Sequence, residues 1–348
     1  MSSNAPSAHP RDQSILSLDG GGIRGLSSLQ ILKQLMEQVN YERDDMGLQP
    51  VKPCDIFDLI IIAIMLGRLQ MDVSECIEVY EKLAKQVFGK QISAWRQLSD
   101  AVAKREIKAK FDSEQLKTEI LDIISQRFPG EDPQDIPLEN SDGNVKCKVA
   151  VCTTSATSAQ SATLLRSYKT RSPGQITTST IVQAALATSA ATGYFDPVTI
   201  QQETFIDGAM RANNPVQETL DEIQAILKLS MTDAAVESCV KCVVSIGTGH
   251  PGLLEISGDP FKVLQKSLVA IVTETEGTAE KFSLRHESLM DGGRYFRFNV
   301  THGLEAVGLE EWNKTPHVTA VTREYLRKQK RPFASCVRSL TDQEGRST

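Results

Sequence analysis

The chain has 348 residues, a net charge of −6 and a hydrophobic fraction of 40%. This length allows one large α/β domain or two small ones, and the negative charge gives no indication of nucleic-acid binding. The longest unbroken apolar run, Leu59 to Leu66, is far shorter than the roughly 20 residues that a membrane-spanning helix needs. We therefore expect a globular protein without a membrane span.

The seven cysteines are an odd number and lie within apolar patterns. This arrangement favours buried thiols in the reducing cytoplasm over a disulfide framework. Residues 1–13 contain no apolar core of the kind that a secretory signal needs. We predict a cytoplasmic protein with a disordered leader over 1–13, one domain over 14–340 and a tail over 341–348.

Apolar periodicity and cap residues predict elements that alternate along the chain. A helix with an apolar face between Leu29 and Val39 follows the first strand, and another begins after the Asp72/Glu75 capping box. Two further helices are expected over 179–192 and after Asn214-Pro215, where Asn214 is the predicted N-cap. The predicted strands cover residues 15–18, 56–61, 145–152, 204–206 and 240–246.

This alternation of strands and helices predicts an α/β fold. The expected architecture is a three-layer helix–sheet–helix sandwich with a largely parallel central sheet. Active sites in such sheets lie at the carboxyl ends of the strands. Glycine-marked turns follow the strands that end at Leu18, Ile206 and Ile246, so we expect the site at that edge.

The first of these turns, Asp19-Gly-Gly-Gly-Ile-Arg-Gly25, lies between a predicted strand and a predicted helix. Successive glycines allow adjacent N–H groups to point into one concavity, and the helix N-terminus adds partial positive charge. Such a loop can bind a phosphate or a developing oxyanion. A dinucleotide site is an alternative, but no apolar strand precedes Asp44 and Asp45, the acidic residues at the required distance.

The second turn, Asp207-Gly208-Ala209, follows a short predicted strand. A carboxylate in this place can be held at the active edge of the sheet. It can equally be a turn aspartate that accepts a hydrogen bond from its own backbone. The residues alone leave both interpretations open.

Several motifs in a fixed order carry a resemblance to the patatin-like phospholipases, and particularly to their fungal members. The resemblance extends over about Ser14 to Val337, nearly the whole chain, and is therefore more specific than any one glycine pattern. The matching segments are Asp19 to Gly25, Thr153 to Ala159, Arg166 to Lys169, Ala187 to Ala191, Asp207 to Ala209, Val244 to Gly249 and Tyr295 to Phe298.

This resemblance implies hydrolysis of phospholipids or other acyl lipids by a Ser–Asp dyad, without metal or cofactor. The family's serine, on a Gly-x-Ser-x-Gly elbow, attacks the ester carbonyl and the aspartate accepts its proton. Carried over to this chain, Asp207 is the base within the triplet Asp207, Gly208 and Ala209. The oxyanion hole is formed by the backbone near Gly21 and Gly22, with Arg24 as the cation of a loop that includes Gly20, Gly21, Gly22, Arg24 and Gly25.

The chain departs from the family at the nucleophile elbow. The family has Gly-Gly-Thr-Ser-Thr-Gly-Gly between a strand that resembles Phe57 to Ile60 and a helix that resembles Ile62 to Leu69. Here the two segments abut, so about seven residues that include the serine are missing. No other Gly-x-Ser-x-Gly pattern occurs in the chain. Because a strand cannot run straight into a helix, we predict that Ile60 to Ala63 form the turn.

Loss of a nucleophile serine typically costs about 10⁶ in turnover. A lone carboxylate with an ordinary pKa of about 4, as expected for Asp207, is a weak base at neutral pH. We therefore expect a patatin-like acyl hydrolase that is inactive as written. The alternative is a non-catalytic lipid-binding or regulatory pseudoenzyme. Three origins fit the gap: a splice variant, a gene-model artefact or a true loss.

A basic cluster near the end of the chain consists of Arg323, Arg327, Lys328, Lys330 and Arg331, followed by Pro332. One interpretation is a solvated helix C-terminus, where cations are favoured by the helix dipole. The other is a peripheral membrane contact with anionic lipid headgroups.

Overall fold

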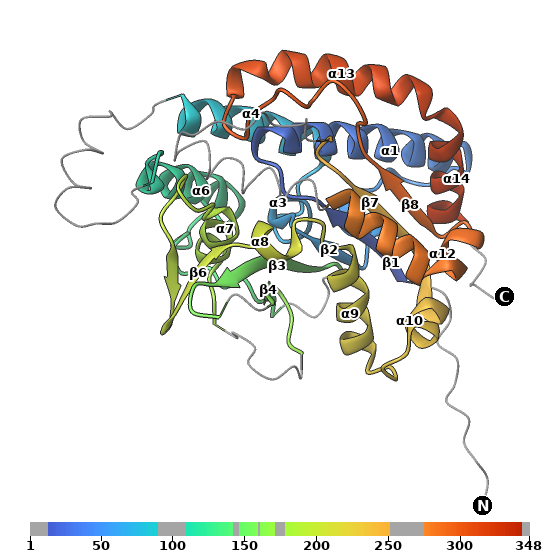
Figure 1. The fold of residues 1–348 in the computed structure, drawn as a ribbon, viewed down its shortest axis with the longest axis horizontal. Coiled ribbons are helices and arrows are strands. Elements are labelled where there is room, and N and C mark those ends of the chain that lie inside the picture. Colours follow the sequence, from blue (N-terminus) through green and yellow to red (C-terminus); the bar gives the residue numbers. More distant parts are fainter. Residues whose placement is uncertain are drawn as a thin grey trace, which may run out of the picture.

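The computed structural model describes residues 13–89, 109–141, 146–158, 161–170, 178–250 and 275–342. The described strands form one eight-stranded sheet in the order β5-β6-β3-β2-β1-β7-β8, and β4 also pairs with β3 (Figure 1). The strands are β1 (Gln13–Leu18), β2 (Leu59–Ile61), β3 (Lys148–Ser155), β4 (Ala162–Arg166), β5 (Val198–Ile200), β6 (Glu203–Asp207), β7 (Val240–Ile246) and β8 (Tyr295–Phe298).

The centre of the sheet is parallel and one side of it is antiparallel. Strands β3, β2, β1, β7 and β8 pair in parallel, whereas β4 and β6 pair with β3, and β5 pairs with β6, in antiparallel fashion. The predicted α/β fold with a largely parallel sheet is confirmed. The antiparallel side is the part that the alternation of elements did not indicate.

Helices cover both faces of the sheet. On one face, α1 packs against α4, α13 and α14, and on the other α9 packs against β1 and β2 (Figure 1). The helices are α1 (Gly25–Asp45), α2 (Pro53–Ile56), α3 (Ile64–Gly67), α4 (Val73–Phe88), α6 (Ser113–Arg127), α7 (Ile181–Ser189), α8 (Ala209–Ala212), α9 (Val216–Leu227), α10 (Asp233–Cys239), α12 (Glu287–Asp291), α13 (Thr315–Lys328) and α14 (Lys330–Thr341), with 3-10 turns η1 (Gly22–Arg24) and η2 (Trp312–Lys314).

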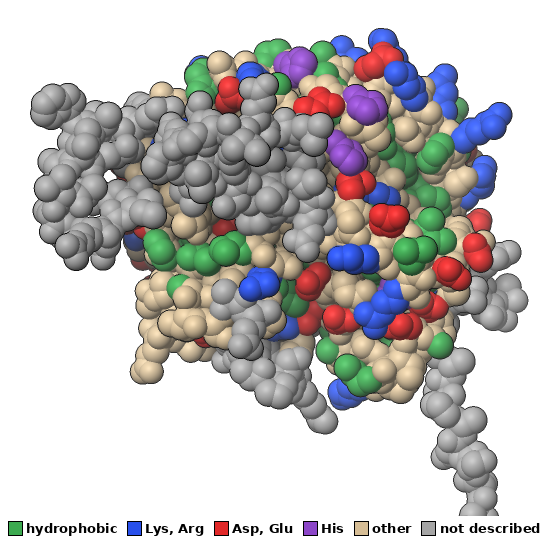
Figure 2. All heavy atoms as spheres, in the orientation of Figure 1, with side chains coloured by type: hydrophobic (Ala, Val, Ile, Leu, Met, Phe, Trp, Pro, Cys, Tyr) green, Lys and Arg blue, Asp and Glu red, His purple; other side chains and the backbone are tan. Residues whose placement is uncertain are grey.

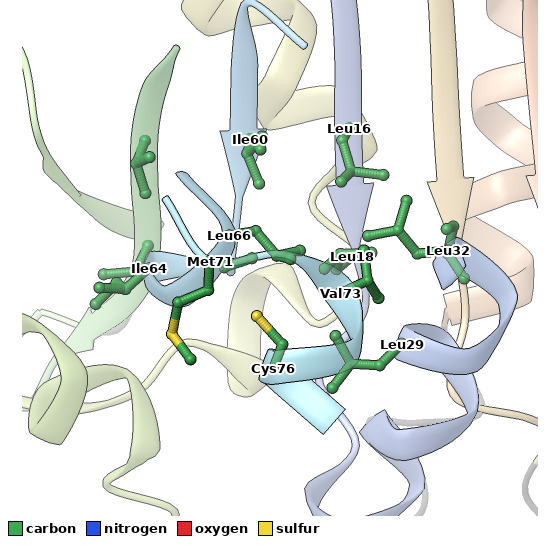
Figure 3. Close-up of a cluster of buried hydrophobic side chains, with 14 of the residues drawn as sticks. Leu16, Leu18, Leu29, Leu32, Ile60, Ile64, Leu66, Met71, Val73 and Cys76 are labelled. Atoms are coloured by element: carbon green, nitrogen blue, oxygen red, sulfur yellow. The ribbon is translucent and has the colours of Figure 1, made fainter. Parts of the chain in front are cut away.

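Alternation along the buried strands divides the core between the two faces. Leu16 of β1 and Ile60 of β2 belong to the cluster under α1 and α4, as Figure 3 shows, together with Leu32 of α1. Ile15 and Leu59 belong to the cluster under α9. Burial on both faces explains why these strands are apolar without interruption.

Two predicted boundaries were wrong at β2 and β3. The strand expected over 56–61 begins at Leu59, because Pro53 opens a helical turn in which Asp55 Oδ2 accepts from the Lys52 N–H at 2.8 Å. Strand β3 runs on to Ser155 because its last residues pair with β6. Residue 145, the predicted start of that strand, lies outside the described residues.

Other predictions were correct to within a few residues. Asp72 caps α4 by accepting from the Glu75 N–H at 2.9 Å, and Thr180 caps the helix expected over 179–192. Asn214 precedes the cap of α9, which is Pro215, although its Oδ1 accepts from the Val216 N–H at 3.3 Å. Residue 13, assigned to the leader, belongs to β1. The single domain over 14–340 stays a prediction.

The junction that lacks the elbow residues is a tight turn at Ile62. Strand β2 ends at Ile61, and the single-turn helix α3 begins at Ile64. Ile62 has a φ of 72°, in the left-handed region that β-branched residues rarely adopt. Its N–H still donates to the Ala150 carbonyl of β3 at 2.9 Å. A turn is present as predicted, but it consists of Ile62 and Ala63, whereas Ile60 and Ile61 stay in β2; the backbone is strained at Ile62.

This strain predicts an inverted preference between glycine and alanine at position 62. Ile62→Gly should be more stable than Ile62→Ala by about 1 kcal/mol, because only glycine adopts this φ without a steric penalty. Urea unfolding of the two variants measures the difference. At Glu37, an exposed position inside α1, the order should be the usual one, with alanine more stable by about 1 kcal/mol. The same order at both positions would contradict a strained turn.

Candidate active site

A cavity of about 360 Å³ opens at the carboxyl ends of β1 and β2. Its polar end contains the glycine loop and Asp207, and the remainder is mostly apolar. The apolar part is lined mainly by side chains of α1, α3, α4, α6 and α7, together with Leu69 between α3 and α4; the helix residues include Leu29, Leu66, Leu83, Val87, Phe88, Leu116, Ile120, Ile124 and Ile181.

Two N–H groups of the glycine loop have no hydrogen-bond partner in the described part of the chain. The Gly20 N–H donates to the Asn213 carbonyl at 2.9 Å, and the Ile23 N–H donates to the Leu309 carbonyl at 2.8 Å. Gly21 and Gly22 make no such donation within the described residues, and both line the cavity. These are the two groups predicted to form the oxyanion hole, and that role stays a prediction.

Neighbouring side chains hold this loop in place. Thr248 Oγ1 donates to the Gly20 carbonyl at 3.1 Å and thereby fixes the peptide plane that carries the Gly21 N–H. The Tyr80 hydroxyl donates to the Gly22 carbonyl. Gly22 has a φ of 53° and lies against the Leu309 backbone, so a larger residue would meet both strain and a collision there. The loop conformation therefore depends on residues far along the chain.

Asp19, directly before the loop, is held by a buried ion pair. The Arg297 guanidinium contacts both oxygens of Asp19, at 2.9 and 2.6 Å, and also the Glu276 carboxylate at 2.5 Å. Burial raises the pKa of the Asp19 carboxyl to about 6, although Arg297 acts in the opposite direction. This bidentate contact fixes the end of β1 from which the glycine loop starts.

Asp207 lies at the polar end of the cavity, as expected. Its Oδ1 accepts from the Ala209 N–H at 2.8 Å, so the turn interpretation also holds. Burial raises the pKa of the carboxyl to about 6, which corrects the ordinary value of about 4 expected from sequence. Gly208 is required by close packing, since a side chain there would collide with the Cys152 backbone.

Asp207 is carried to the site by an antiparallel strand, whereas the sequence predicted a largely parallel sheet. Strand β6 is antiparallel to β3, and Asp207 is opposite Thr153 in the register. Because β3 continues beyond the end of β2, β6 pairs with this extension, and its last residue faces the site. Ile62 follows β2 on this same edge of β3, since β4 occupies the opposite edge, and it lines the same cavity.

Among the predicted loop residues, Gly20, Gly21, Gly22 and Gly25 line the cavity. Arg24 does not: it is 3% exposed, and its Nε has no hydrogen-bond partner within the described residues. Burial lowers the pKa of its guanidinium to about 10. The placement does not support a direct ligand contact for Arg24.

The structure also removes the basis for a dinucleotide site. Asp44 and Asp45 belong to the last turn of α1 and not to a strand end. No group of three metal-ligating side chains occurs in the described part of the chain, and none of its helices is long and apolar enough to cross a bilayer. Sequence reasoning had assigned no individual role to Tyr80, Thr248 or Asn213, which lie at the glycine loop or the cavity.

The chain matches a known protein family over more than half of its length. The family model described as patatin-like phospholipase matches residues 16–220, which include the glycine loop and Asp207. The chain belongs to the patatin-like phospholipase family. The matched segment also contains strands β2 to β6 and the Ile62 turn.

Similar proteins carry phospholipase names. Calcium-independent phospholipase A2-gamma of Mus musculus is 28% identical over 82% of this chain and 34% of its own length. Phospholipase A I of Arabidopsis thaliana is 24% identical over 94% and 28%. The cGAMP-activated phospholipase of Vibrio cholerae is 28% identical over 67% and 63%. The chain thus spans about a third of the length of the first two relatives.

Among solved structures, the chain is similar to VipD from Legionella pneumophila, with a TM-score of 0.36 and 15% identity over 92% of this chain and 68% of that one.

The raised pKa of Asp207 predicts that the free energy of unfolding of this patatin-like chain falls as the pH rises. Because this pKa rises from 3.8 to about 6 on folding, the folded state binds the proton more tightly, and ionisation destabilises it as pH rises from 4 through 6. Asp207→Asn should therefore match the parent at pH 4 and exceed its unfolding free energy by about 2 kcal/mol at pH 8. Urea unfolding at both values measures this. Asp44→Asn, at an exposed position, should change little at either pH. An equal effect of Asp207→Asn at pH 4 and pH 8 would contradict the argument.

Proposed function

We propose that this patatin-like chain binds the acyl group of a phospholipid or related lipid, and that it does not hydrolyse the ester as it stands. Family membership supports a lipid acyl substrate, and the apolar cavity beside two free N–H groups supports an acyl chain with its carbonyl at the polar end. With an elbow serine present, the same site would act as a Ser–Asp acyl hydrolase.

One observation carries this proposal: an isoleucine occupies the turn where the family places its nucleophile. Ile62 lines the same cavity as Asp207 and the glycine loop, and its left-handed φ supplies the sharp strand-to-helix turn that an elbow needs. A hydrocarbon side chain can neither attack a carbonyl nor give a proton to Asp207. The base and the oxyanion donors are thus present around a position without a nucleophile.

Restoring the elbow tests the proposal directly. Insertion of Gly-Gly-Thr-Ser-Thr-Gly-Gly between Ile60 and Ile61 should produce p-nitrophenyl ester hydrolysis, whereas the parent chain should show none above background. The reason is that turnover lost with a nucleophile serine, about 10⁶, returns with it. Stopped assays of initial rate give the measurement.

Two controls accompany this experiment. The same insertion with alanine in place of its serine should remain inactive, and Asp207→Ala should abolish the restored activity. Ester turnover by the parent chain that disappears in Asp207→Ala would show instead that this carboxylate activates water, and would overturn the inactive interpretation.

We also propose that the basic cluster contacts an anionic membrane surface. All five side chains are exposed, and Figure 2 shows Lys and Arg gathered over the α13–α14 corner. The expected helix C-terminus accounts for only part of the cluster: Lys330 and Arg331 open α14, where the helix dipole disfavours cations. Pro332 lies in the first turn of α14, so it does not mark the end of a helix.

Replacing Arg327, Lys328, Lys330 and Arg331 with serine should weaken binding to phosphatidylserine vesicles, by up to about 1 kcal/mol for each residue. Vesicle sedimentation at low salt measures the binding. The matched control, Lys82→Ser with Lys85→Ser on α4, should bind like the parent. Equal binding by the parent and the fourfold variant would remove the proposal.

A further inference from the structure

Asn213, which ends α8, places a side-chain amide at the polar end of the cavity. The side chain is 6% exposed and lies against the glycine loop, because a methyl group on Gly20 would collide with Asn213 Oδ1. The amide is therefore next to the loop whose Gly21 and Gly22 N–H groups are free.

This buried amide is unsatisfied. Asn213 Nδ2 has no hydrogen-bond partner among the described residues, although buried polar groups are almost always paired. Rotation of the amide by half a turn exchanges Nδ2 with Oδ1: the N–H then lies beside Gly20, and Oδ1 takes the enclosed position. The backbone carbonyl of Asn213, which accepts from the Gly20 N–H, is independent of this side chain.

The adjacent residue, Asn214, has a structural role, because both ends of its side-chain amide are hydrogen-bonded. Asn214 is 2% exposed. Its Nδ2 donates to the Thr275 carbonyl at 2.9 Å, and its Oδ1 accepts from the Val216 N–H at 3.3 Å. Packing and capping explain Asn214, whereas an unpaired amide destabilises the fold and needs another explanation.

We infer that the Asn213 amide binds the ligand by donating to the carbonyl oxygen of the acyl group. This inference rests on the proposed function, since it takes the cavity to hold an acyl chain. The carbonyl oxygen has two lone pairs and meets donors from Gly21, Gly22 and Asn213 at the polar end. The site should therefore discriminate in favour of an acyl ester over a hydrocarbon of equal chain length, because a hydrocarbon leaves these donors unpaired.

Two probes with the same tail separate the carbonyl contact from burial of the chain. Methyl laurate and dodecane compete with the fluorescence of bound anilinonaphthalene sulfonate on the full chain. The parent should bind methyl laurate more tightly than dodecane. Asn213→Ala should lower the affinity for methyl laurate about 10-fold and leave that for dodecane unchanged. Asn213→Leu, which keeps most of the side-chain volume, should do the same.

The melting temperature distinguishes this ligand contact from a purely structural role of Asn213. A structural role predicts that Asn213→Ala lowers the melting temperature. Asn213→Ala should melt at the temperature of the parent or above it, because it removes an unpaired polar group. Asn214→Ala, the matched control, should melt at a lower temperature. If Asn213→Ala lowers the melting temperature as Asn214→Ala does and keeps the ester preference, the inference is wrong. If the parent binds neither probe, the proposed function itself fails, and the two failures are thus distinguishable.

Discussion

The structure depends on how two adjacent parallel strands turn at the carboxyl edge of the sheet. Strands β1 and β2 are buried on both faces, and each must reverse into a helix within a few residues. After β1 the reversal uses glycines, one of which has a left-handed φ. After β2 the left-handed residue is Ile62. The turn after β1 therefore forms without backbone strain, whereas the turn after β2 is strained at Ile62.

The position of these turns decides what the cavity can do. The glycine turn lines the cavity, and its conformation is held by Thr248, Tyr80 and Leu309. The Ile62 turn ends the neighbouring strand and places an apolar side chain at the same cavity. The proposed binding of an acyl carbonyl depends on both turns together.

Buried polar groups gather at this end of the molecule and reduce its stability. Asp207 and Asp19 are carboxyls whose pKa burial raises to about 6, and the Asn213 amide has no partner in the described structure. Apolar residues of similar size would remove these costs. Groups that destabilise a fold and line one cavity are typical of a functional site, since stability alone does not explain them.

The sequence by itself determined the local and repetitive features of this protein. Apolar runs located β1, β2 and β7, the Asp72 cap located α4, and the spacing of glycines located the loop, because each of these depends on neighbours within a few residues. It also located Asp207 and the missing elbow, through ordered motifs. Tertiary structure alone decided the antiparallel pairing that carries Asp207 to the cavity, the φ of Ile62, the raised pKa of Asp207, and the contrast between Asn213 and Asn214. These depend on which distant segments share a register or a cavity, and two adjacent asparagines look alike until their partners are in place.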